Sequence, residues 1–138
     1  MKKLLFSTRI YAIDVALLLL RIGTSVLIGT HGWPKIANFS SYLNSFADPL
    51  GLGVATSLQL TIFAEFFCAI LVALGLVTRL ALIPLIITMG TVAFVVHGAD
   101  PFGDKELALM YLVAFVALFI TGPGRFSVDA QILRRNRF

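Results

Sequence analysis

The chain has 138 residues, of which 59% are hydrophobic, and its mean hydropathy is +0.96. Soluble domains are only about half apolar, so this composition indicates a membrane protein. The net charge of +4 comes from basic residues scattered around apolar blocks, which argues against nucleic-acid binding, and the single cysteine, Cys68, excludes an intramolecular disulfide.

Four segments are apolar enough to cross a bilayer as helices, which takes about 20 residues. They are residues 14–33, 55–77, 80–97 and 106–122. The first is predicted to end before Pro34, which lacks a backbone N–H. This segment carries Arg21 and is longer than the apolar region of a signal peptide, so we expect it to be retained. Pro84 falls in the first turns of the third segment, and Gly122 begins a Gly-Pro-Gly stop after the fourth.

Two segments outside the predicted spans have helical features of their own. Residues 36–47 place aromatic and aliphatic side chains at helical spacing, which suits a helix lying in the membrane interface. The basic tail, residues 125–138, contains Ser127, a good N-cap residue. The tail is either a short amphipathic helix held at the inner surface by its arginines or a frayed basic end.

Lysine and arginine placement predicts the orientation in the membrane. With four spans, eight basic residues share one side: Lys2, Lys3, Arg9, Arg79, Arg125, Arg134, Arg135 and Arg137. The opposite loops hold only Lys35 and Lys105. By the positive-inside rule both termini face the cytoplasm. The predicted fold is therefore one all-α integral membrane domain over residues 1–138, a four-transmembrane-helix bundle with a short interfacial helix in its first outer loop.

Two charged residues lie well inside the predicted spans, away from the span ends. A charge at membrane depth costs about 2.5–3.5 kcal/mol on insertion scales, so Arg21 and Glu65 should point into the bundle and find partners. Their depths differ by only roughly 5 Å at 1.5 Å per residue, which an arginine side chain spans. We therefore predict an Arg21–Glu65 ion pair. Such a pair either belongs to a functional seam or only holds the bundle in register.

Titratable residues gather at the predicted outer end. His31 ends the first span, His97 ends the third and Glu106 opens the fourth. Such a cluster could exchange protons with a quinol, because histidine titrates near neutral pH, whereas interfacial histidines bonded to loops are the alternative. Axial haem ligation by the two histidines is disfavoured because both lie at the rim. No spacing typical of a metal site is present, so we predict no bound metal.

Several short motifs in order along the chain resemble those of one known family. They are HGWPK at residues 31–35, Glu65, GLVTR at 75–79, His97, ELALMYL at 106–112 and GPGRFSVD at 122–129. The sequence resembles the DoxX family over nearly its whole length. The resemblance implies a small four-helix, multi-pass protein of the bacterial cytoplasmic (inner) membrane. It also implies a membrane component of redox assemblies in sulfur or oxidative-stress chemistry, because the family name comes from a subunit of thiosulfate:quinone oxidoreductase.

Two functional hypotheses follow. In the first, the chain is the membrane subunit of a quinone-linked oxidoreductase with partner redox subunits. Proton exchange then falls to Glu65, His31, His97 and Glu106, and ligand binding to Arg21, His31, Trp33, Lys35, Glu65 and His97. In the second, the same residues hold together a non-catalytic scaffold or a small-ligand binding or transport-related module. The sequence leaves self-association open and names no partner beyond the lipid bilayer.

Overall fold

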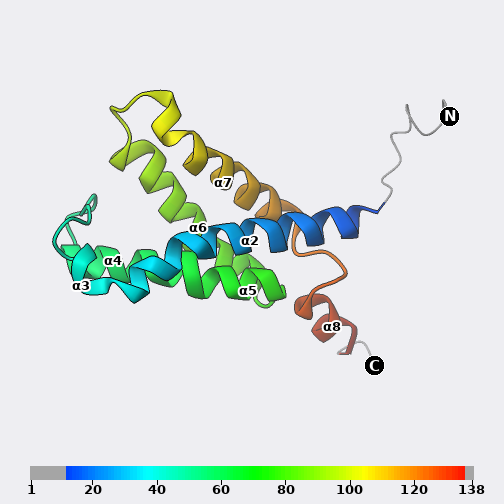
Figure 1. Cartoon of the computed structure of the whole chain (residues 1–138). Coiled ribbons are helices and arrows are strands. Elements are labelled where there is room, and N and C mark those ends of the chain that lie inside the picture. The colour runs from blue at the N-terminus through cyan, green and yellow to red at the C-terminus, as the bar shows by residue number, and fades with distance from the viewer. Residues whose placement is uncertain (1–11, 136–138) are drawn as a thin grey trace.

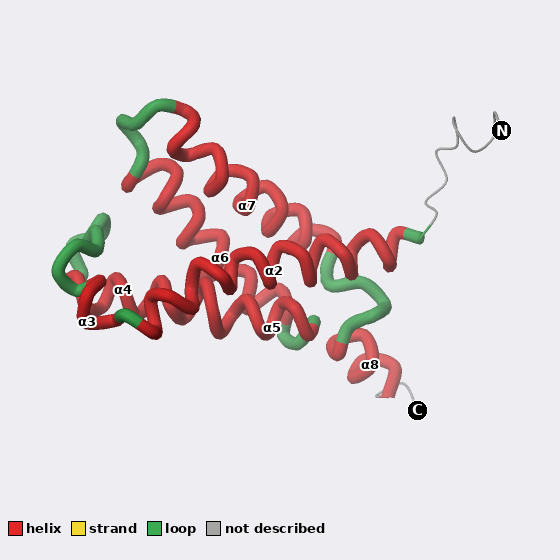
Figure 2. The backbone as a smooth tube through the Cα atoms, in the orientation of Figure 1, coloured by secondary structure: helices red, strands yellow, loops and turns green. Residues whose placement is uncertain are grey.

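The computed structural model describes residues 12–135, and every regular element within that range is a helix (Figure 2). Four helical segments form the body of the molecule: α2 (Ile13–Ala37), the continuous run of α4 (Val54–Ile62), η1 (Phe63–Cys68) and α5 (Ala69–Leu74), the run of α6 (Thr78–Thr91) and η2 (Val92–Val96), and α7 (Phe102–Thr121). Two short helices flank them, α3 (Phe39–Tyr42) and α8 (Val128–Arg135). The all-helical prediction is thus confirmed for the described residues.

The segments pack as two pairs (Figure 1). The α4–η1–α5 run lies along α2, and α6 lies antiparallel to α7. We call one end of the molecule the Lys35 end; there α2 and η2 finish and α4 and α7 begin. At the opposite Arg21 end α2 starts, α5 turns into α6, and α7 leads into α8 (Figure 1).

Three helical runs are long and apolar enough to cross a membrane: Ile13–Ala37, Val54–Leu74 and Thr78–Val96. They match the first three predicted spans. The 20-residue α7 carries charged residues in its first two turns, and its status as a fourth span remains a prediction, as does the orientation of the termini. Apolar side chains cover the outer surfaces of the helices, including Val113 and Ile120 of α7 at 69% and 71% exposed. Such surfaces are typical of helices in lipid.

The expectation that the first helix ends before Pro34 is wrong. α2 continues to Ala37 with Pro34 inside it. The proline removes one donor, but its own carbonyl accepts the backbone N–H of Asn38 at 2.9 Å, so the following turn is still bonded. Pro84 is also inside a helix, as the seventh residue of α6. Helices in membranes tolerate such prolines because neighbouring groups satisfy the freed backbone.

Two of the helical runs contain a π-helical turn, η1 and η2. Their backbone bonds span five residues, as from the His97 N–H to the Val92 carbonyl at 2.9 Å. Such wide turns are rare and frequently lie at functional sites. Here η1 contains Glu65, and η2 directly precedes His97.

The Arg21–Glu65 prediction is wrong. The buried guanidinium of Arg21 donates to the carbonyls of Pro123, at 2.6 Å from Nη1, and Phe126, at 2.7 Å from Nη2. Glu65 pairs with Lys35 instead. The depth estimate considered only charged side chains as partners and overlooked backbone acceptors. The chain beyond the end of α7 crosses the Arg21 end, and its Pro123 and Phe126 carbonyls accept from Arg21.

Of the two alternatives for the tail, the structure shows the short helix, α8. Ser127 Oγ accepts the N–H of Ala130 at 3.2 Å, the bond expected of an N-cap. The Asp129 carboxylate bonds the backbone N–H groups of Val77, at 2.8 Å, and Thr78, at 2.9 Å, and so caps the start of α6. Gly75 has φ +70° and lies so close to Arg21 and Ser127 that no side chain fits there. The segment 122–129 is therefore fastened at the Arg21 end.

Candidate ligand-binding site at the Lys35 end

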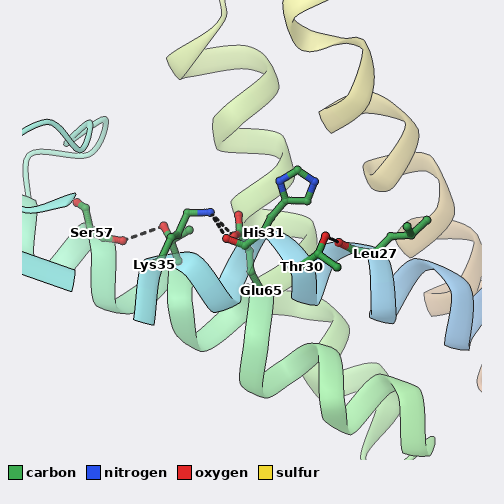
Figure 3. Close-up of polar contacts among 7 residues, drawn as sticks. Leu27, Thr30, His31, Lys35, Ser57 and Glu65 are labelled. Carbon is green, nitrogen blue, oxygen red and sulfur yellow. Dashed lines mark hydrogen bonds and ion pairs between the residues drawn. The ribbon is translucent and has the colours of Figure 1, made fainter. Parts of the chain in front are cut away.

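An ion pair joins α2 to η1 inside the bundle. Lys35 Nζ lies 2.5 Å from Glu65 Oε2 and also donates to the His31 carbonyl at 2.8 Å (Figure 3). The Glu65 side chain is 5% exposed and the Lys35 side chain 14%. An unpaired charge at membrane depth is costly, and here each of the two charges is neutralised by the other.

The HGWPK motif explains how α2 makes this pair. Gly32 faces η1 so closely that a Cβ there would lie 3.0 Å from both the Glu65 carbonyl carbon and the Phe66 nitrogen. Lys35 lies three residues after Gly32 and four residues after His31. At these helical spacings Lys35 and His31 project from the same side of α2 (Figure 3). Glycine at position 32 thus brings Lys35 within reach of Glu65.

A cavity of about 380 Å³ opens beside the ion pair. Helices α2, α4, η1, α6, η2 and α7 supply its walls, and the loop before α4 supplies part of its rim. Its polar lining consists of Lys35, Glu65, His31, His97, Asp104, Tyr111, Ser57, Thr61, Thr88 and Thr91. The remaining lining is mostly aliphatic, with Ile28, Leu60, Ile87, Met89, Val92 and Leu107 among it. An apolar cavity of this size with a few polar groups is typical of a small-molecule site.

Aromatic packing holds one wall of the cavity. The His31 ring meets the Tyr111 ring edge-on, with centroids 6.3 Å apart. Tyr111 in turn stacks on Phe115 at 5.8 Å, and Phe115 is fully buried. The imidazole of His31 therefore lies between α2 and α7.

A second titratable pair lies at the rim. His97 Nδ1 is 2.8 Å from Asp100 Oδ2, and the side chains are 34% and 47% exposed. His97 lines the cavity, whereas Asp100 does not. Lys105 Nζ donates to the Gly98 carbonyl at 2.9 Å and ties the connecting loop to the first turn of α7. His97 is thus held where the cavity meets the outside.

The loop between α3 and α4 is fastened by one carboxylate. Asp48 accepts the Ser57 hydroxyl at 2.7 Å and the N–H groups of Leu52 and Gly53 at 3.0 and 2.9 Å. Donation from Ser57, followed by these backbone bonds, keeps the pKa of Asp48 below its usual value although partial desolvation opposes the effect. The fixed loop places Phe46, Leu50 and Leu52 against the cavity.

The cavity collects four of the predicted site residues: His31, Lys35, Glu65 and His97. The other three lie elsewhere. Arg21 is at the opposite end, Trp33 is 58% exposed against the Phe66 ring at 5.8 Å, and Glu106 is exposed on α7 outside the cavity lining. Trp33 follows Gly32 directly, so it points away from η1's backbone, and Glu106 is two residues from Asp104, which turns it to another face of α7.

Sequence reasoning did not single out several polar residues of this region. They are Tyr111, Asp100 and Asp48. Tyr111 had a usable signal, since Asp104, Ala108 and Tyr111 follow one another at spacings of four and three and so share a helix face. Asp48 and Asp100 are loop residues, and nothing in a periodic pattern indicates which backbone or ring atom they contact.

The bundle and its buried ion pair define the chain as a small helical membrane protein with a candidate ligand cavity at one end. The sequence profile of the DoxX family matches residues 16–98. Two Escherichia coli K12 proteins are similar along most of their length. Inner membrane protein YphA is 32% identical over 131 residues, covering 85% of this chain and 90% of the relative. Inner membrane protein YqjF is 32% identical over 127 residues, covering 88% and 95%.

The chain belongs to the DoxX family. Together with its three apolar spanning helices, this membership makes it a multi-pass protein of the inner membrane. No solved structure matches the chain.

Proposed function

We propose that this protein is the membrane subunit of a quinone-linked redox assembly and that the cavity at the Lys35 end binds the quinone head group. The observation that carries the proposal is the buried Lys35–Glu65 pair at the wall of an otherwise largely apolar cavity. Apolar walls suit a ring, and donors such as the Lys35 ammonium and the Tyr111 hydroxyl suit its oxygens.

In this proposal the residues of the cavity bind and exchange protons. Lys35 donates to a ligand oxygen while Glu65 balances its charge, and His31 and His97 supply imidazole nitrogens that can accept or donate a proton. A bound quinone would supply a two-electron, two-proton couple, with the electrons exchanged with a partner redox subunit. No residue of the described chain is assigned the electron transfer.

The proposal includes a fourth span and an orientation. α7 has 20 residues and outward-facing apolar side chains, so it can complete the bundle as a span. The basic residues near the Arg21 end then place that end in the cytoplasm and the cavity at the outer face. Reporter fusions after Phe138 and near Asn44 test this orientation, and an outer-side signal from the C-terminal fusion would contradict it.

Ligand binding is tested with the purified protein in nanodiscs and decylubiquinone as the probe. We expect a saturable calorimetric signal that weakens at least about tenfold in Lys35→Met, because a charge-assisted hydrogen bond is lost. Glu106→Gln is the control, since it removes a charge outside the cavity. Absence of saturable binding, or equal weakening by Glu106→Gln, would refute the quinone site.

A second candidate is a non-catalytic scaffold or small-ligand module. It is favoured by the internal satisfaction of Lys35, which bonds both Glu65 and the His31 carbonyl and thereby locks α2 to η1. In that case Lys35→Met lowers thermal stability, and neither the wild type nor the variant binds decylubiquinone. Measuring melting and decylubiquinone binding on the same samples separates the two candidates.

A further inference from the structure

We propose that Asp100 is a positioning residue that makes His97 a hydrogen-bond acceptor toward the cavity, so that the cavity prefers a hydroxyl-bearing quinol to its quinone. The ligand preference rests on the proposed function. The tautomer assignment rests on the His97–Asp100 contact alone.

The contact fixes which ring nitrogen carries the hydrogen. Asp100 is 47% exposed, and the oxygens of a carboxylate only accept hydrogen bonds. His97 Nδ1 lies 2.8 Å from Asp100 Oδ2, and Nδ1 must therefore donate. In the neutral imidazole one nitrogen donates and the other accepts, so Nε2 carries the lone pair.

The remaining nitrogen is the one that His97 offers to a ligand. His97 lines the cavity and Asp100 does not, so the Nδ1 bond leads out of the cavity. The connecting loop is restrained by the Lys105 bond to Gly98 and by tight packing of Gly98 on the Phe94 carbonyl. The ring is therefore held by its outer edge, which leaves Nε2 for the inside.

An accepting Nε2 discriminates between redox states of a ligand. A quinol hydroxyl donates to it, whereas a quinone carbonyl finds no donor there. The other titratable groups of the cavity are Lys35 and His31 on α2, Glu65 on η1, and Asp104 and Tyr111 on α7. These groups are the same in the wild type and in an Asp100 variant. A change in the preference for quinol over quinone in that variant therefore reports on His97.

The first arm of the test needs no ligand. With two histidines in the chain, ¹⁵N NMR of the imidazoles at about pH 8, where imidazoles in general are neutral, resolves His97 after assignment with His31→Gln. We expect Nδ1–H in the wild type and a shift to Nε2–H in Asp100→Ala, with Asp104→Ala as a control that retains Nδ1–H. Nε2–H in the wild type, or no change in Asp100→Ala, overturns the assignment.

The second arm compares decylubiquinol with decylubiquinone in nanodiscs under anaerobic conditions. The ratio of their dissociation constants should favour the quinol, and Asp100→Ala should reduce that preference about threefold to tenfold, the effect of one hydrogen bond. An unchanged ratio overturns the ligand preference. If neither probe binds the wild type, the quinone site and the ligand preference both fail, while the NMR result still decides the role of Asp100.

Discussion

Gly32 lies against the backbone of Glu65, and this contact sets the distance between α2 and η1. A Cβ at position 32 would lie 3.0 Å from the Glu65 carbonyl carbon and 3.1 Å from its oxygen. Both atoms belong to backbone, which cannot rotate away as a flexible side chain would. The buried ion pair is therefore a consequence of a glycine three residues before its lysine.

The first prediction follows directly. Gly32→Ala should destabilise the protein by about 1–3 kcal/mol, as overpacking of a tight contact does, and lower its melting temperature in detergent. Gly23→Ala and Gly29→Ala on the same helix are matched controls, because a Cβ at either position meets nothing within 4 Å. These two changes should be neutral or stabilising by up to about 1 kcal/mol, since alanine is the better helix former. Equal effects at all three positions would contradict the close contact.

The second prediction concerns the ion pair. Lys35→Met and Glu65→Gln should each lower the free energy of unfolding by more than a surface change does, because each leaves a buried partner unpaired. The double variant should lose less than the sum, with a coupling energy of about 1–3 kcal/mol in a double-mutant cycle. Additive effects would show that the two side chains do not interact in the membrane protein.

Much of the fold was predictable because hydrophobic length is a strong signal. Three helices of the structure are long and apolar enough to span a membrane, and their bounds differ from the predicted ranges only at the ends. At Pro34 the prediction failed because a single missing N–H does not end a helix whose next turn remains bonded. The π-helical turns were not predictable from periodicity, since an inserted residue changes the register of every later side chain.

The candidate site was predictable in its residue types and less so in its pairs. Glu65 was recognised because a charge within an apolar span is costly, and His31 and His97 were recognised because each ends a predicted span at the same side of the membrane. Their partners depend on contacts between segments: Lys35 reaches Glu65 through the Gly32 crossing, and Asp100 reaches His97 through a loop. A depth argument compares heights along the membrane normal, and it contains no information about which helix faces are adjacent. This is why Arg21 was given the wrong partner.

The third prediction separates the two ends of the molecule. Arg21→Met should destabilise strongly, because it leaves the carbonyls of Pro123 and Phe126 without their donor and detaches the chain beyond α7. Arg21→Lys should rescue only in part, since one ammonium does not match two acceptors held by a guanidinium fork. In a double-mutant cycle Arg21→Met and Glu65→Gln should be additive within about 0.5 kcal/mol. A larger coupling would restore a direct Arg21–Glu65 interaction.

The last prediction concerns acid stability through Asp129. Burial alone would raise the pKa of Asp129, but hydrogen bonds from Thr78 and Val77 and the nearby charge of Arg21 outweigh it and keep the pKa below its usual 3.8. A carboxyl with a lowered folded-state pKa stabilises the fold fully above its unfolded pKa, and this contribution is lost as the pH falls through the lower folded value. The melting temperature of the wild type should therefore decline below about pH 4, and Asp129→Asn should be less stable near neutral pH while losing less on acidification. Glu106→Gln removes an exposed carboxyl at the other end and should follow the wild-type curve. Parallel curves for wild type and Asp129→Asn would mean that the cap on α6 does not depend on the carboxylate charge, and the attachment of α8 would then rest on Arg21 and the Gly75–Asp129 backbone bond.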